Sequence, residues 1–282
     1  MNAASNPPYA ARDPVWARFL LIAATVVFLG LFLFLPLAVV FTEAFQKGVA
    51  LYFAALTEEN ARSAIGLTLS IAAIAVPLNA VFGVAAAWAI AKFEFRAKSL
   101  LLALIDMPFA VSPVVAGMVY LLLFGAGSVL GKYFDDWGIQ IVFALPGMAL
   151  ATVFVTFPFV ARELIPLMQA QGSDQEMAAL SLGASGWRTF LRVTLPNIRW
   201  ALFYGVILAN ARAMGEFGAV SVISGHIRGE TNTLPLHIEV LYNEYHSGAA
   251  FACASLLSLL GLGTLAIKSL IEWRTGKRRH HL

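Results

Sequence analysis

Long apolar runs separated by short polar segments dominate the pattern of this chain. A helix needs about 20 apolar residues to cross the hydrocarbon core of a bilayer. Six stretches meet this requirement with at most two charged residues each: 19–41, 63–91, 100–124, 138–161, 200–223 and 247–267. The pattern therefore predicts six membrane-spanning helices joined by polar loops, which include residues 43–62 and 226–246.

The first apolar run indicates an uncleaved span rather than a secretory signal. A signal has an apolar core of about 7–15 residues followed by a small-residue cleavage site. Residues 19–41 are longer than this and no such site follows. Pro36 is expected to kink this helix near its exit.

Composition supports an all-α membrane protein. Hydrophobic residues make up 60% of the 282 positions and charged residues only 12%, which is about half the charged share of a soluble domain. Six spans leave no room for a separate soluble catalytic domain. The single cysteine, Cys253, excludes an internal disulfide and a cysteine-based metal site, and its apolar surroundings predict a small core residue.

The distribution of lysine and arginine predicts the orientation. Cytoplasmic loops carry the excess of these residues. Fourteen of the nineteen fall on one side of the predicted spans, with Arg162 counted as a loop residue, four fall on the other side, and Arg212 lies within a span. Both termini are therefore expected in the cytoplasm, as a tail over 1–18 and a basic tail over 271–282.

The segment 173–196, called the elbow below, is a polar island between the fourth and fifth predicted spans. Ser173 and Glu176 have the spacing of a capping box, and a short helix is expected from there to about Leu182. Gly183 is expected to end it.

A second short helix is predicted in the elbow. Ser185 is its candidate N-cap, and Trp187 and Phe190 recur at helical spacing. Leu195-Pro196 is expected to close it, since a residue before proline is pushed out of the α region. Two interpretations of the elbow remain open. It is either a docking element, in which small residues allow another protein surface to approach closely and aromatic side chains insert into that surface, or an amphipathic segment at the lipid interface.

The elbow resembles the cytoplasmic loop of permease subunits from bacterial ABC importers. That family has Glu-Ala-Ala, three residues, Gly, and an apolar-x-Leu-Pro type of ending about nine residues later. Ala178-Ala179, Gly183 and Leu195-Pro196 match, while Met177 occupies the glutamate position and Glu176 lies one residue early. The resemblance implies a coupling helix that docks on an ATPase subunit through Glu176, Met177, Ala178, Ala179, Gly183, Ala184, Trp187, Phe190, Leu195 and Pro196.

Further motifs narrow the resemblance to oxyanion permeases. Residues 106–117 (DMPFAVSPVVAG) resemble the third-span signature of one branch of oxyanion permeases, and residues 210–220 (NARAMGEFGAV) resemble the fifth-span signature shared by sulfate and molybdate permeases. Residues 227–231 (IRGET) and 234–236 (LPL) resemble the second, W-type permease of sulfate/thiosulfate importers. The resemblance implies a type I importer permease core over 60–270 in the bacterial inner membrane, with molybdate or tungstate as the alternative cargo.

The same resemblance implies the partners. These are a T-type permease subunit, two ATPase subunits that bind ATP and Mg, and a periplasmic sulfate- or thiosulfate-binding protein, with no cofactor in this chain and no nucleic acid. The sequence agrees with ATP binding by separate subunits, because Gly131-Lys132 is followed by Tyr133 and so does not form the Walker A loop of an ATPase. An ion-coupled secondary transporter and a channel stay open as alternatives of other classes, although the sequence has no internal repeat that would favour the first and no filter-like loop that would favour the second.

Four residues are candidates for the translocation path: Arg212, Glu216, Ser112 and Ser221. Arg212 and Glu216 are four residues apart and can pair on one helix face, so Arg212 either attracts an anion or forms a neutral structural pair. The two serines either donate to oxyanion oxygens or bond back to their own helix. Asp106 would repel an anion, and His226, His237 and His246 are expected at the polar surface.

Overall fold

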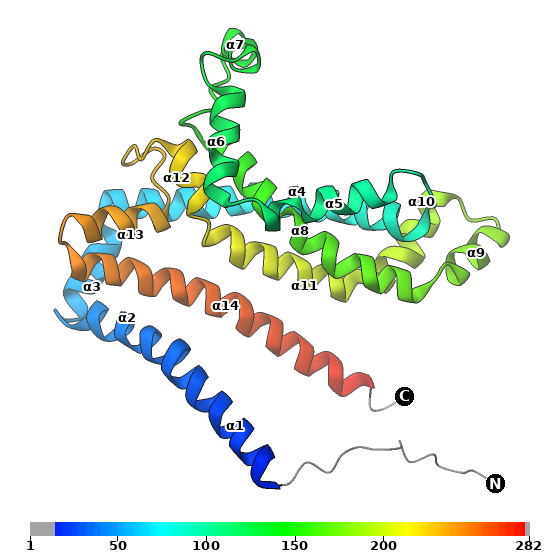
Figure 1. Cartoon of the computed structure of the whole chain (residues 1–282), viewed down its shortest axis with the longest axis horizontal. Helices are drawn as coiled ribbons and strands as arrows, with labels where there is room; N and C mark the ends of the chain where they lie inside the picture. The colour runs from blue at the N-terminus through cyan, green and yellow to red at the C-terminus, as the bar shows by residue number, and fades with distance from the viewer. Residues whose placement is uncertain (1–14, 280–282) are drawn as a thin grey trace.

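The structure is a computed structural model that describes residues 15–279, and every regular element within that range is a helix. Figure 1 shows α4 (Glu59–Lys92), α8 (Leu145–Gln171) and α11 (Leu195–Met214) running along the long axis of the molecule. The elbow helices lie at one end of these three helices, and α3 (Val49–Thr57) and α13 (Leu234–Asn243) lie at the other end (Figure 1). The all-α prediction is confirmed for this range.

Small residues allow the three central helices to approach closely. A Cβ added at Gly83 of α4 would lie 2.7 Å from Val160 of α8, and one at Gly205 of α11 would lie 3.0 Å from the Val160 backbone. Close packing of this kind drives the association of helices in lipid, where the hydrophobic effect does not favour helix–helix contact. A buried hydrogen bond of 2.6 Å from Asn79 to Thr156 also joins α4 to α8.

The first span is longer than predicted. It comprises α1 (Val15–Leu29), a π-helical turn η1 (Gly30–Phe34) and α2 (Leu35–Phe45). The wide turn ends two residues before Pro36, which has no N–H to continue a regular ladder, so the predicted irregularity falls here. Residues 15–18 of the predicted tail are helical, and residues 1–14 lie outside the described range.

Two predicted loops contain helices. Residues 43–62 hold α3 (Val49–Thr57) and the first turn of α4, because the apolar face of α3 places Tyr52 against α14 (Ser247–Arg279). Residues 226–246 hold α13 (Leu234–Asn243), which packs on α14 (Ser247–Arg279). Helix α14 continues past 267 through most of the predicted tail, whereas the part of it that is long and apolar enough to span a membrane is Ser247–Leu270. Residues 280–282 lie outside the described range.

Two other spans are broken rather than continuous. The third consists of α5 (Lys98–Ala110) and α6 (Pro113–Phe124), bent by 108°, and the fifth of α11 and α12 (Gly218–Ser224), bent by 50°. Ser112 has φ −58° and ψ 134°, close to polyproline II and outside the α region, as expected of a residue before proline. Among the described residues, four helices are long and apolar enough to span a membrane, and six spans result if each bent pair counts as one.

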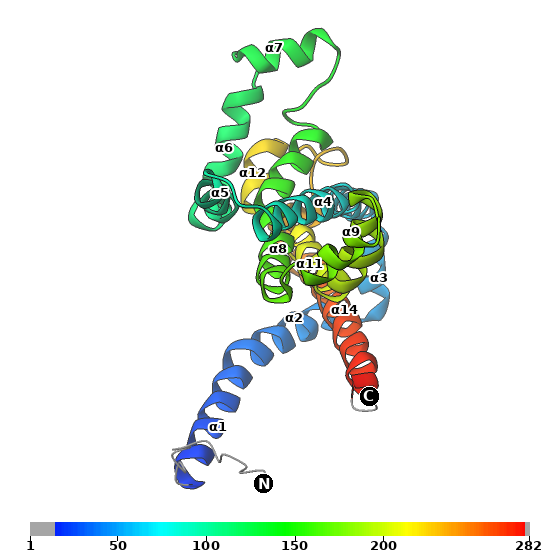
Figure 2. The same ribbon diagram turned by 90° about the vertical axis from the view of Figure 1, so that its right-hand side faces the viewer.

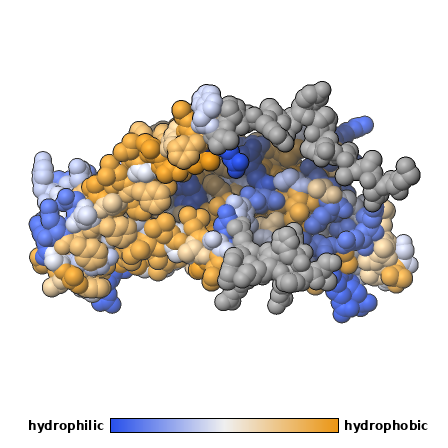
Figure 3. Space-filling view, turned by 90° about the horizontal axis from the view of Figure 1, so that it is seen from below, coloured by the Kyte–Doolittle hydropathy of each residue, from blue (hydrophilic) through white to orange (hydrophobic). Residues whose placement is uncertain are grey.

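The fourth span starts later than predicted. Residues 138–144 form an irregular segment, and α8 begins at Leu145 and continues to Gln171. Before it, α6 leads into α7 (Val129–Asp136), and this arm projects from one side of the body while α1 projects from the other in both ribbon views (Figures 1 and 2). On the face shown in Figure 3, hydrophobic residues cover much of the surface, and hydrophilic residues gather at one end and over much of the opposite half.

Candidate functional site

The elbow contains two short helices joined at a glycine. Helix α9 runs over Asp174–Ser181 and α10 over Gly186–Thr189. Gly183 has φ +84°, a left-handed conformation that costs little only for glycine. The predicted end of the first helix at Gly183 agrees with this geometry. The Ser185 hydroxyl accepts a hydrogen bond from the Arg188 N–H at 3.4 Å and is the expected N-cap of α10.

The predicted capping box at the start of α9 does not form. The Ser173 side chain makes no capping hydrogen bond. Glu176 points instead toward the body, where its Oε1 lies 2.9 Å from Lys92 Nζ and accepts from the Thr194 hydroxyl at 3.2 Å. Lys92 and Thr194 are thus the partners of this carboxylate in place of the Ser173 N–H that a capping box would use, since a charge-assisted bond is the stronger.

These contacts set the ionisation of Glu176. Burial raises the pKa of its carboxyl, but the hydrogen bonds from Lys92, the backbone and Thr194, together with the Lys92 charge, outweigh burial. The pKa of Glu176 is therefore lower than usual, and the side chain is a carboxylate at neutral pH.

Leu195-Pro196 does not end a helix, contrary to the prediction. A π-helical turn, η2 (Phe190–Thr194), follows α10 and leads directly into α11, with Pro196 in its first turn. Proline is accepted there because the first N–H groups of a helix have no intrahelical partner. The second half of the elbow is therefore continuous with the fifth span.

The residues predicted to dock divide into an outward and an inward set. Met177 and Trp187 are exposed to 55% and 69%, and Ala178 and Pro196 are also exposed. Glu176, Ala179, Ala184, Phe190 and Leu195 are partly buried. Phe190 contacts Trp88 of α4, with ring centroids 4.9 Å apart.

Sequence reasoning missed two apolar residues on the outward side. Leu182 is 89% exposed and Leu180 is 51% exposed. They join Met177, Ala178, Gly183 and Trp187 in what we call the outward elbow surface. Apolar residues in a short helix suggest burial, so the sequence alone carried no signal that these two leucines face outward.

Arg212 and Glu216 form the pair that their spacing predicted, but not on one helix face. Helix α11 ends at Met214, so Glu216 lies in the break before α12. Its Oε2 is 2.6 Å from Arg212 Nη1, and its Oε1 accepts from the Ala219 N–H at 2.9 Å. The Glu216 side chain is 1% exposed and that of Arg212 is 34% exposed. The carboxylate thus joins the two halves of the broken span.

The other candidates for the membrane path differ in position. Ser112 is exposed at the start of α6. Ser221 donates to the Gly218 carbonyl at 2.9 Å, which is the local bond open to a serine in a helix. Arg162, counted as a loop residue, lies within α8, and its Nε is 2.9 Å from Asp106 Oδ1 of α5.

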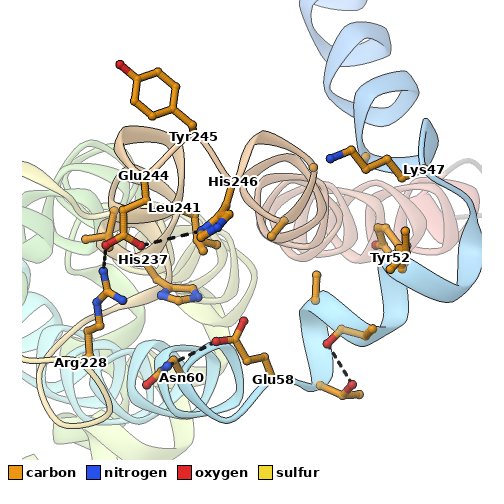
Figure 4. Close-up of a pocket in the computed structure, with 18 residues that line it drawn as sticks. Lys47, Tyr52, Glu58, Asn60, Arg228, His237, Leu241, Glu244, Tyr245 and His246 are labelled. Carbon is orange, nitrogen blue, oxygen red and sulfur yellow. Dashed lines mark hydrogen bonds and ion pairs between the residues drawn. The ribbon is translucent and has the colours of Figure 1, made fainter.

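A cavity of about 690 Å³ lies at the end of the molecule opposite the elbow (Figure 4). Its lining includes Glu58, Arg228, His237 and Glu244, and Arg228 pairs with Glu244. His237 was expected at the surface, but it is 3% exposed and neither ring nitrogen has a hydrogen-bond partner. Helix α13, unforeseen in the sequence, turns this side chain inward.

Burial lowers the pKa of His237. The charge of Glu58 opposes the shift, that of Arg228 adds to it, and that of Glu244 opposes it. The side chain is therefore neutral at neutral pH. Within residues 15–279, no group of three or more His, Cys, Asp or Glu residues could hold a metal ion.

The arrangement of bent and straight spans, with a folded elbow at one end, is that of a transporter subunit. A solved bacterial ABC transporter that imports the acidic polysaccharide alginate has the same fold, with a TM-score of 0.76 over 92% of this chain and 96% of that chain at 14% identity. The family model of the binding-protein-dependent transport system inner membrane component matches residues 79–277. The chain belongs to this family, and its fold is the type I permease fold of ABC importers.

Curated relatives match over nearly the full chain. The sulfate transport system permease protein CysW of Escherichia coli K12 is 52% identical over 266 residues, which cover 94% of this chain and 91% of the relative. The CysW protein of Synechocystis is 52% identical over 264 residues, with 94% and 95% covered. The sulfate transport system permease protein CysT of E. coli K12 is 34% identical over 257 residues, which cover 91% of this chain and 93% of that relative.

Proposed function

We propose that this chain is a permease subunit that carries sulfate or thiosulfate across the bacterial inner membrane in an ATP-driven importer. The observation that carries the proposal is the 52% identity to sulfate transport system permeases over 94% of the chain. The higher identity to CysW than to CysT assigns it to the W-type position. The T-type subunit is then its partner in a heterodimer.

The outward elbow surface is the proposed contact with an ATPase subunit. It presents apolar side chains at the tip of a polar segment, and exposed patches of this kind mark binding sites. The flanking Arg188 and Arg192 suit an acidic rim on the partner. ATP and Mg are bound by two separate ATPase subunits, and closure of these subunits displaces the elbow and rocks the spans between inward-open and outward-open states.

The opposite end of the molecule is the proposed extracytoplasmic side. Both termini then lie in the cytoplasm, as the lysine and arginine distribution predicts. A periplasmic sulfate- or thiosulfate-binding protein delivers the anion to this side. The membrane path includes Arg212, Glu216, Ser112 and Ser221, with Glu216 neutralising most of the attraction that Arg212 exerts on an anion.

Uptake by the reconstituted complex tests the proposal. The two permeases, the ATPase and the binding protein are assembled in proteoliposomes, and uptake of labelled sulfate is measured with ATP and with a non-hydrolysable analogue. The proposal expects uptake only with ATP, with competition by thiosulfate. Uptake driven by an ion gradient without ATP would indicate a secondary transporter. Uptake of molybdate in preference to sulfate would show that molybdate, not sulfate, is the transported anion.

A further inference from the structure

The last turn of α4 contacts both halves of the elbow. Trp88 and Lys92 are four residues apart and therefore lie on one face of α4. Lys92 Nζ lies 2.9 Å from the Glu176 carboxylate of α9, and the Trp88 ring lies 4.9 Å from the Phe190 ring of the turn that follows α10. Two separate contacts thus connect α4 to a segment that is about 80 to 100 residues away in the sequence.

Lys92 is the more central of the two α4 residues. Its ammonium also donates to the Gly172 carbonyl, at the point where α8 ends. It therefore links α4, α8 and α9 through a single side chain. The Lys92 and Glu176 side chains are only 9% and 16% exposed, so water screens this pair far less than an ordinary surface ion pair.

Helix α4 is well placed to pass on a displacement. Its cytoplasmic half packs in a buried cluster with α8 and α11, in which Ile90, Leu164 and Ile198 are fully buried. Closely packed interiors transmit displacement because they deform little. A shift of α9 that reaches Lys92 therefore moves the central helices together.

The covalent route from the elbow to α11 is less regular. It passes through η2, a π-helical turn at which the backbone ladder changes its spacing. Thr194, at the end of that turn, donates to Glu176, so the irregular route is itself tied to the ion pair. Glu176 thus joins α9, η2 and α4.

We infer that Lys92 and Glu176 are positioning residues that transmit the movement of α9 to α4 and α8, and that Glu176 serves this role instead of touching the ATPase. The inference rests on the proposed function of the elbow. It assigns Glu176, one residue away from the expected glutamate position, a task inside this chain.

The test compares charge reversals in the complete reconstituted complex. Lys92→Glu and Glu176→Lys each place like charges together, and the double variant restores an attraction with the charges exchanged. The matched control reverses Lys98 and Glu94 singly, because this pair has a similar distance of 2.8 Å but lies at the surface, with Glu94 91% exposed. Sulfate uptake, ATP hydrolysis and copurification of the ATPase are measured for each variant.

The expected result is a loss of coupling. Uptake per ATP hydrolysed falls about tenfold in each Lys92 and Glu176 variant, while the ATPase still copurifies, and the double variant recovers part of the loss. The Lys98 and Glu94 variants keep the ratio of the unaltered complex. An unchanged ratio in the single variants, no recovery in the double variant, or loss of the copurified ATPase would each overturn the inference.

The same assay separates this inference from the proposed function. If the unaltered complex shows no ATP-dependent sulfate uptake, the proposed function fails. If that complex works and the single variants work equally well, only the role of the ion pair fails.

Discussion

Pro113 and Gly218 meet where the third and fifth spans break. Each stands at the start of the second half of its span, and a Cβ on Gly218 would lie 3.0 Å from the Pro113 Cβ. One turn further along α6, a Cβ on Gly117 would lie 2.5 Å from the Ala219 carbonyl oxygen of α12. The two half-helices α6 and α12 therefore pack backbone to backbone and stabilise each other's bend.

This contact predicts a strong effect at Gly117. Gly117→Val forces α6 and α12 apart, because the added atoms meet backbone rather than a movable side chain, and should cost about 2 kcal/mol or more of unfolding free energy. Thermal unfolding of the purified complex measures the change. Gly66→Ala is the control, since a Cβ there meets nothing within 4 Å, and alanine in a helix should be neutral or stabilising. Equal effects of the two substitutions would contradict the close packing.

A second prediction concerns Arg212 and Glu216. Arg212→Gln leaves the buried Glu216 carboxylate without its ionic partner and should abolish most sulfate uptake, because an unpaired buried charge is costly. The double variant Arg212→Gln with Glu216→Gln removes both charges and should recover uptake to within about threefold of the unaltered complex if the pair is structural. Uptake that stays lost in a stably folded double variant would show that the anion needs the Arg212 charge.

The sequence predicted the helical class well, and four of the six expected spans contain a single helix long and apolar enough to cross a membrane, because each depends mainly on its own apolar run. The breaks at Ser112 and Gly215–Phe217 were harder to foresee, since Pro113 and the glycines permit a bend but the contact between α6 and α12 determines its size. Helix α13 was missed for a similar reason. Its polar residues suggested a loop, whereas packing on α14 makes it a helix and buries His237.

The elbow shows the same division between local and tertiary causes. Gly183 and Ser185 act on their immediate neighbours, and both were placed from the sequence. The role of Glu176 depends on Lys92, which is 84 residues earlier in the chain. A capping box was the better local interpretation, but a tertiary partner replaced it.

The turn at Gly183 gives a third prediction. Gly183→Val places a β-branched side chain at φ +84°, which strains the backbone by about 1–2 kcal/mol, although no atom lies within 4 Å to clash with it. The turn between α9 and α10 should change shape, so sulfate uptake should fall several-fold more than ATP hydrolysis. Gly186→Ala is the control, because its surroundings are also open and its φ is not positive. Normal uptake in Gly183→Val would contradict the role of the turn.

His237 gives a prediction about pH. Its pKa is lower in the folded chain than in the unfolded chain, so its contribution to stability is complete above the unfolded value of about 6.5 and is lost as the pH falls toward the folded value. His237→Phe removes this titration and should flatten the decrease in thermal stability of the solubilised complex between about pH 7 and pH 5. Identical profiles for His237→Phe and the unaltered chain would show that His237 is not buried as a neutral group.

The contact between the outward elbow surface and the ATPase is tested most directly by cross-linking at Leu182. Cys253→Ala removes the single cysteine, and Leu182→Cys then places one thiol at the 89% exposed position. A short bifunctional thiol reagent, applied to membranes that contain the whole complex with cysteines introduced on the ATPase surface, should join this thiol to the ATPase subunit. A thiol that reacts with a membrane-impermeant reagent outside intact cells, or that never cross-links to the ATPase in the assembled complex, would contradict the account.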